Sequence, residues 1–178
     1  MRTPPEVWLR GPLPGIPPLL QPVAHSLLQS REEIAAILPQ LTARELWREP
    51  GGAASAGYHA RHATGSLDRL FTYARGEPLS AAQREVLLTE GKADREEGAP
   101  ERLIAAFSAQ VDRALAQLRA TSESDLTETR LVGRARIPST VIGLLFHAAE
   151  HTQRHVGQLT AITKVVRGTA APAAVPER

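Results

Sequence analysis

Apolar residues recur every three or four positions over four long stretches of the chain, the spacing that places them on one face of an α-helix. These stretches cover residues 19–38, 53–75, 100–121 and 139–167. Residues that end helices follow three of them, with Pro39 after the first, Gly76 and Pro78 after the second, and Gly168 after the last. Alternation with a period of two is weak throughout. The pattern therefore predicts an all-α fold, a four-helix bundle with long connections.

Shorter elements are expected in the connections. Thr42 and Glu45 have the spacing of a capping box, which predicts a short turn of helix after the first long one. A second short helix is expected at 81–89. The apolar residues within 122–138 predict a brief pair of extended segments before the last helix.

The two ends of the chain differ in composition from the helical part. Residues 1–18 contain six prolines and predict an extended, proline-rich arm, and residues 169–178 predict a flexible tail. A single helical domain is expected over 19–168. Trp8 and Trp47 are candidate anchors for contacts between subunits, and the alternative for either is a place in the core. We expect a homodimer.

The composition excludes several classes of function. The 178 residues are 42% hydrophobic, which suits one domain with a proper core. Because there is no cysteine, disulfides and thiolate metal sites are excluded, and a cytoplasmic location is expected. The net charge is only +2 and aromatic residues are 4%, which argues against nucleic-acid binding. No apolar run approaches the ~20 residues that span a bilayer, so no membrane association is expected.

Five of the six histidines lie on two predicted helices, His59 and His62 on the second and His147, His151 and His155 on the last. On a helical wheel, His151 and His155 fall in the middle of the apolar stripe, one turn apart, and His147 falls at its edge. Two imidazoles at this spacing can bind one metal ion, and a third ligand from a facing helix would complete an open site. The alternative is a pair of core histidines bonded to other side chains.

The helical wheel alone does not decide which histidine of the second predicted helix would be the third ligand. On the second predicted helix, His59 lies about 60° from the centre of a stripe rich in alanine and His62 about 120°, which favours His59. The sequence 151–155 lacks the glutamate of the zincin motif, and no carboxylate is placed as a general base. Glu150 is expected to be solvated or to contact a metal ligand. His25, isolated on the first predicted helix, is expected to be exposed.

Two segments resemble the DinB-like superfamily of metal-binding four-helix bundles. Residues 55–76, which begin Ser-Ala-Gly-Tyr-His-Ala-Arg-His, are similar to part of the second helix of that family. Residues 143–158 contain His151 and end in His155-Val-Gly-Gln158, and they are similar to its histidine-rich last helix. The number and order of the predicted helices agree with the family over most of 19–167.

The resemblance implies a metal held by His62, His151 and His155, with His59 as an alternative ligand or neighbour and His147 as a candidate pocket residue. Zinc and nickel are the first candidates for the divalent ion, and manganese and iron are the alternatives. Some members resemble transferases or isomerases in which the metal binds a low-molecular-weight thiol. The chain is therefore expected to be a metal-dependent hydrolase or thiol-dependent transferase acting on a small-molecule substrate. The alternative is a non-enzymatic helical module, for dimerisation or stress response, with structurally satisfied histidines.

Overall fold

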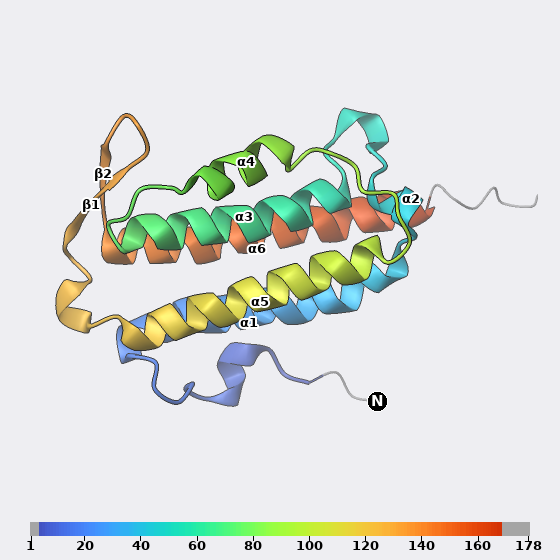
Figure 1. The fold of residues 1–178 in the computed structure, drawn as a ribbon. Coiled ribbons are helices and arrows are strands. Elements are labelled where there is room, and N and C mark those ends of the chain that lie inside the picture. Colours follow the sequence, from blue (N-terminus) through green and yellow to red (C-terminus); the bar gives the residue numbers. More distant parts are fainter. Residues whose placement is uncertain (1–3, 169–178) are drawn as a thin grey trace, which may run out of the picture.

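Four long helices make up most of the fold in the computed structural model, which describes residues 4–168. They are α1 (Gln21–Ile37), α3 (Ala56–Ala74), α5 (Ala99–Ala120) and α6 (Val141–Gly168). Helices α3 and α6 form one layer and α1 and α5 the other, and each helix contacts one helix of the opposite layer (Figure 1). The predominantly helical fold is confirmed, and each long helix begins and ends within about one turn of its predicted limits. The predicted tail at 169–178 lies outside the described residues.

Polar caps determine where several helices begin. The side chain of Ser55 accepts a hydrogen bond from the backbone N–H of Tyr58 at 3.1 Å, at the start of α3. The predicted capping box is present at α2 (Ala43–Leu46), where Thr42 and Glu45 each bond the backbone of the other. These contacts satisfy N–H groups that the first turn of a helix leaves without an internal partner.

The predicted short elements are present beside the long helices. Helix α4 (Ala81–Thr89) lies on the outer side of α3. Strands β1 (Thr129–Val132) and β2 (Ile137–Thr140) pair antiparallel just before α6. The hairpin therefore stands at the end of the molecule where α3 ends and α6 begins (Figure 1).

The start of α6 differs from the sequence expectation. Pro138, expected at the beginning of the last helix, lies in β2 opposite Leu131. The cap is supplied by Thr140, whose side chain accepts a hydrogen bond from the backbone N–H of Gly143 at 3.1 Å. The helix thus begins only after the hairpin has closed.

The segment before α1 lies against the body of the protein. Val7 and Ile16 are buried, and Val7 begins a 3-10 turn, so the segment is not extended throughout. His25, expected to be exposed, is partly buried, because its Nε2 lies 3.1 Å from the carbonyl oxygen of Gly11. The arm is therefore tied to α1 by both apolar and polar contacts.

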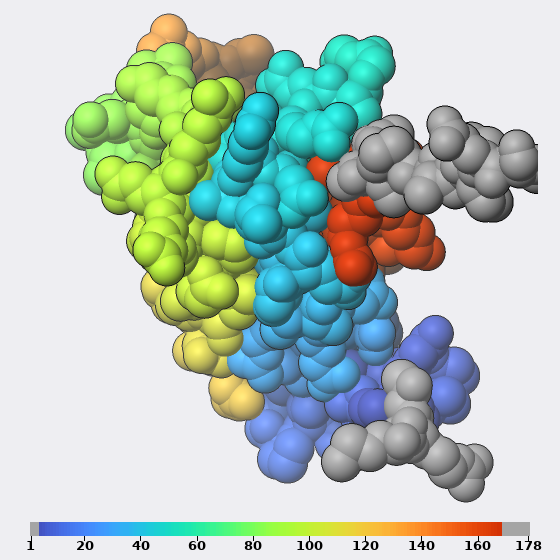
Figure 2. Space-filling model, turned by 90° about the vertical axis from the view of Figure 1, so that its right-hand side faces the viewer, coloured from blue at the N-terminus to red at the C-terminus, as the bar shows by residue number. Residues whose placement is uncertain are grey.

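The core lies between the two layers, and α2 contacts α5 and α6 at one end of the molecule. Figure 2 shows the surface at this end, where the cyan residues that follow α1 lie toward the viewer. Its largest fully buried side chains include Leu27, Phe71, Phe107 and Leu159. Of the two alternatives for Trp47, the structure supports the core, because the residue is 7% exposed and a Cβ on Gly57 would lie 2.8 Å from its ring. No helix within residues 4–168 has an apolar stretch long enough to cross a bilayer.

Candidate metal centre

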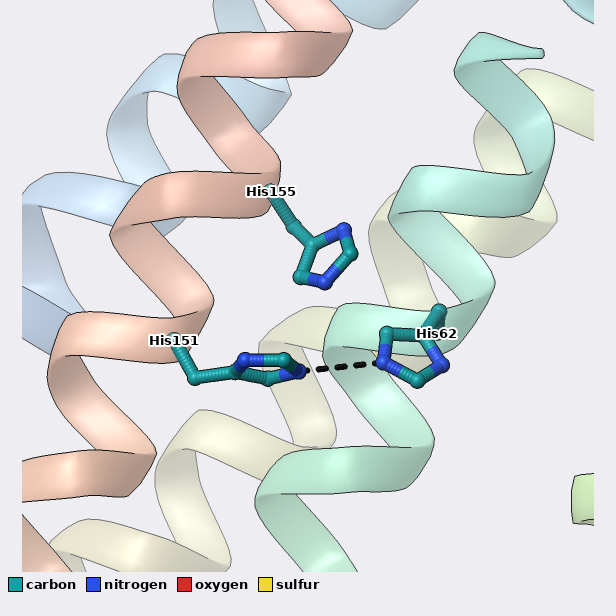
Figure 3. A group of neighbouring side chains, drawn as sticks. All are labelled: His62, His151 and His155. Atoms are coloured by element: carbon teal, nitrogen blue, oxygen red, sulfur yellow. Dashed lines mark hydrogen bonds between the residues drawn. The ribbon is translucent and has the colours of Figure 1, made fainter. Parts of the chain in front are cut away.

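Three histidines meet between α3 and α6, which pack along each other. Figure 3 shows His62 of α3 opposite His151 and His155 of α6. One ring nitrogen from each of the three lies within 4.8 Å of the others. Nε2 of His62 and Nε2 of His151 are 3.0 Å apart. Because all three side chains are only partly buried, the group lies at the border between the core and the surface.

His59 lies beside this group, one turn before His62 on α3. It is 7% exposed, and its Nδ1 is 2.9 Å from Nδ1 of His155. The helical-wheel prediction that His59 faces inward is therefore confirmed. However, His59 contacts Nδ1 of His155, so only Nε2 of His155 remains available to a metal. The structure groups His62, not His59, with the two histidines of α6.

The placement of His151 and His155 at the centre of the buried stripe of α6 is wrong. Both are only partly buried, whereas the residue after each of them, Thr152 and Val156, is 0% exposed. Thr152 and Thr163 are polar and did not count toward the apolar stripe, yet both are buried. The inward face of α6 is therefore rotated toward these threonines, and the two histidines lie on its flank, facing α3.

A buried carboxylate contacts His62 from the side opposite His151. Glu90 directly follows α4 and is 3% exposed. Its Oε2 accepts a hydrogen bond from Nδ1 of His62 at 2.7 Å, and its Oε1 accepts one from Nη1 of Arg69 at 2.6 Å. Since Nδ1 carries the proton toward Glu90, Nε2 of His62 has a free lone pair directed at His151. No sequence motif pointed to Glu90.

A glycine on α3 makes room for this buried ion pair. A Cβ on Gly65 would lie 2.7 Å from Nη1 of Arg69 and would also overlap Oε1 of Glu90. Any larger residue would have to displace the pair. Gly65 thus lets the carboxylate and guanidinium lie flat against α3, one turn from His62.

Burial lowers the pKa of His155, His151 and His59 and favours their neutral forms. Burial, together with the neighbouring His62 and His151, lowers the pKa of His155 to about 4. Burial likewise lowers the pKa of His151 and of His59, with His62 adding to the effect in both. Neutral imidazoles keep the lone pairs that a metal requires.

Glu90 is the negative charge of the site. Burial by itself would raise the pKa of Glu90, but the hydrogen bonds from His62 and Arg69 outweigh it and hold the pKa below its ordinary value. The carboxylate is therefore ionised at neutral pH. When one ring nitrogen of a histidine donates a hydrogen bond to an ionised carboxylate, the other ring nitrogen becomes a stronger metal ligand.

His147 and Glu150 lie at the rim of the group. The side chain of His147 is 51% exposed, and its Nδ1 is 3.5 Å from Oε2 of Glu150. Its ring centroid is 5.4 Å from that of His151. Glu150 also pairs with Arg154. These two residues contact the neighbourhood of the site without joining its three nitrogens, and Glu150 is partly solvated, as expected.

These features define a helical protein with a candidate three-histidine metal centre between two of its long helices. The family can be named from the comparison of sequences. The family model of the DinB superfamily matches residues 3–159, and the chain therefore belongs to this superfamily. A search of the curated proteins gives no match.

Proposed function

We propose that this chain is a DinB-like four-helix bundle that binds one divalent metal ion through His62, His151 and His155. The observation that carries the proposal is the convergence of three imidazole nitrogens within 4.8 Å of one another. With Zn–N bonds of about 2.0–2.1 Å, ligand nitrogens of a tetrahedral site lie roughly 3.3 Å apart. The 3.0 Å between Nε2 of His62 and Nε2 of His151 is close to this spacing, and the ring nitrogen of His155 lies within 4.8 Å of both.

The residues around the group support this assignment. Metal-binding histidines usually donate their outer N–H to a fixed acceptor, which orients the ring. Glu90 provides that acceptor for His62, and His59 provides one for His155. Nδ1 of His151 is buried and has no hydrogen-bond partner among residues 4–168. Among the described residues, His151 therefore contacts His62 through Nε2 and has no hydrogen bond at its other ring nitrogen.

The donor set suits zinc or nickel, with manganese and iron as alternatives. When bound, such an ion lowers the pKa of a coordinated water or thiol and so supplies a nucleophile at neutral pH. We therefore propose a metal-dependent hydrolase or a thiol-dependent transferase, which would use a low-molecular-weight thiol, acting on a small-molecule substrate. Support comes from the partial exposure of the three histidines and from the exposed His147 beside them, which leave the site within reach of solvent.

The metal is tested by calorimetric titration of untagged, metal-free protein with Zn²⁺, Ni²⁺, Mn²⁺ and Fe²⁺. We expect about one ion per chain, and loss of binding in His62→Ala, His151→Ala and His155→Ala. His147→Ala, a histidine of the same helix outside the group, is the matched control and should bind normally. Absence of binding in the parent protein would favour the alternative, a non-enzymatic helical module whose histidines only bond one another.

The reaction class is tested with the metal-loaded protein. Hydrolysis of activated esters and amides would support a hydrolase, and consumption of a low-molecular-weight thiol by an electrophile would support a transferase. In either case the activity should disappear in His151→Ala and remain in His147→Ala. Activity that survives in both variants would arise outside this site.

We further propose a homodimer and a cytoplasmic location. The apolar side chains Trp8, Leu9 and Leu19 near the N-terminus are 61%, 57% and 62% exposed, and they offer surface that a second copy would bury. Sedimentation velocity of the protein and of Trp8→Ala tests the first point. A monomer at micromolar concentration would contradict it. Cell fractionation tests the second.

A further inference from the structure

A second region, remote from the histidines, has the composition of a ligand site. It is a hollow of about 930 Å³ lined by α4, the segment that joins it to the end of α3, and the β1–β2 hairpin. Figure 1 shows where these elements lie in the fold. Tyr73 lines it from α3. At ~1.5 Å per residue, Tyr73 lies roughly 16 Å along this helix from His62. The hollow is therefore separate from the candidate metal centre, and its size suits a small organic molecule.

The hollow is strongly basic. Four arginines line it, together with a single carboxylate, that of Glu77. Glu77 is held by Arg75, which lies outside the hollow, at 2.7 Å. Among the described residues, no carboxylate lies within ion-pairing distance of Arg84, Arg134 or Arg136. Three cations thus face this region without a counterion from residues 4–168.

Apolar side chains lie next to these cations. Leu87 and Leu88 of α4 line the hollow and are 45% and 82% exposed, and Leu131 of β1 lines it from the hairpin and is 39% exposed. No residue within α4 is fully buried. The hollow thus has an apolar side next to its cations, a combination that suits a ligand with an apolar part.

The turn of the hairpin positions Arg136. Arg136 has a φ of 49°, a left-handed conformation that glycine or asparagine adopts at lower cost. Its backbone N–H bonds the carbonyl oxygen of Gly133 at 3.2 Å and closes the turn. A left-handed residue is common in short hairpin loops, and the turn places Arg136 in the lining of the hollow.

We infer that this hollow binds an organic anion, a carboxylate or phosphate carried on an apolar body. Arginines bind both head groups through paired N–H donors, which here come from Arg134 and Arg136. Arg84, whose Nη1 donates to the carbonyl oxygen of Leu79, adds positive charge. The apolar body lies on the leucines of α4 and β1. The inference does not depend on the metal centre, because none of the three grouped histidines lines this hollow.

The test uses displacement of the fluorescent anion 8-anilinonaphthalene-1-sulfonate by decanoate, decyl phosphate and decanol, all as monomers. We expect at least one of the two anions to bind about tenfold or more tightly than decanol, and salt to weaken its binding. The stronger of the two identifies the head group as carboxylate or phosphate. Arg134→Gln and Arg136→Gly should each weaken the anion about threefold to fivefold, the loss expected for one partly solvated charge pair.

Two controls separate binding from folding. Arg95→Gln removes another exposed arginine, one outside the hollow, and should leave the affinity unchanged. Glycine adopts a positive φ at lower cost than arginine, so the thermal unfolding midpoint of Arg136→Gly should not fall below that of the parent protein. Equal binding of decanol and both anions would overturn the inference, as would equal affinities of Arg134→Gln, Arg136→Gly and Arg95→Gln. Binding to anionic vesicles without binding of either monomeric anion would also overturn it.

Discussion

Replacing Glu90 by glutamine tests how the buried carboxylate acts on the histidine group. The substitution keeps the volume of the side chain and removes its charge. Glu90 accepts hydrogen bonds from two donors, Nδ1 of His62 and Nη1 of Arg69, at 2.7 and 2.6 Å. A glutamine has only one acceptor oxygen, so its amide N–H groups must face one of these donors.

The expected magnitudes follow from this loss. The side chains of Arg69 and Glu90 are 10% and 4% exposed, so Glu90→Gln leaves a mostly buried guanidinium without its counterion. We expect the metal-free protein to lose about 2–4 kcal/mol of its free energy of unfolding. We expect zinc affinity to fall about 10–100-fold, because His62 loses the acceptor that orients its ring.

Two assays separate these effects. Urea unfolding, followed by circular dichroism, measures the stability of the metal-free protein, and calorimetric titration measures zinc affinity. Glu85→Gln, an exposed carboxylate on α4, is the matched control and should change stability by less than about 0.5 kcal/mol. Equal zinc affinities of Glu90→Gln and Glu85→Gln would refute the role of Glu90 in orienting His62, even if stability fell. Equal stabilities would refute the buried ion pair.

Three further predictions concern stability. The pKa of His155 is about 4 in the folded protein, against an ordinary value of 6.5, so the unfolded chain binds more protons between these pH values. The metal-free protein should therefore lose stability as pH falls from about 6.5 toward 4. Equal urea midpoints at pH 7.5 and 5 would contradict this prediction. Gly65→Ala should lower the free energy of unfolding by about 1–3 kcal/mol, because the new Cβ overlaps the Arg69–Glu90 ion pair. Gly157→Ala, whose Cβ would lie in open space, should raise it by up to ~1 kcal/mol. Urea unfolding of both variants checks these opposite signs. Gly57→Ala should cost about 1–3 kcal/mol and alter the fluorescence of Trp47, and an unchanged spectrum would show that the ring does not lie against α3.

Local signals in the sequence predicted much of the fold. The long helices follow from apolar periodicity and from caps such as Ser55 and Thr42, which act within a few residues of themselves. The hairpin was likewise expected from the residues between α5 and α6. Pro138 was misplaced because a proline suits both the start of a helix and a two-stranded ribbon, and only the pairing with Leu131 distinguishes them.

The site was harder to predict because it depends on how the helices are rotated. Helix α3 contacts α4, α5 and α6, so its alanine stripe does not define one inward direction, and both His59 and His62 reach α6. On α6, buried Thr152 shifts the inward face away from His151. Glu90 reaches His62 only because α4 folds back over α3, and no spacing along the chain encodes that contact.

The most direct test of the metal centre is a crystal structure of the metal-loaded protein, with anomalous diffraction measured on both sides of the absorption edge of the bound metal. We expect one strong anomalous peak per chain, within about 2.3 Å of a ring nitrogen of each of His62, His151 and His155. A peak at other residues, or no peak from protein shown to contain the metal, would contradict it.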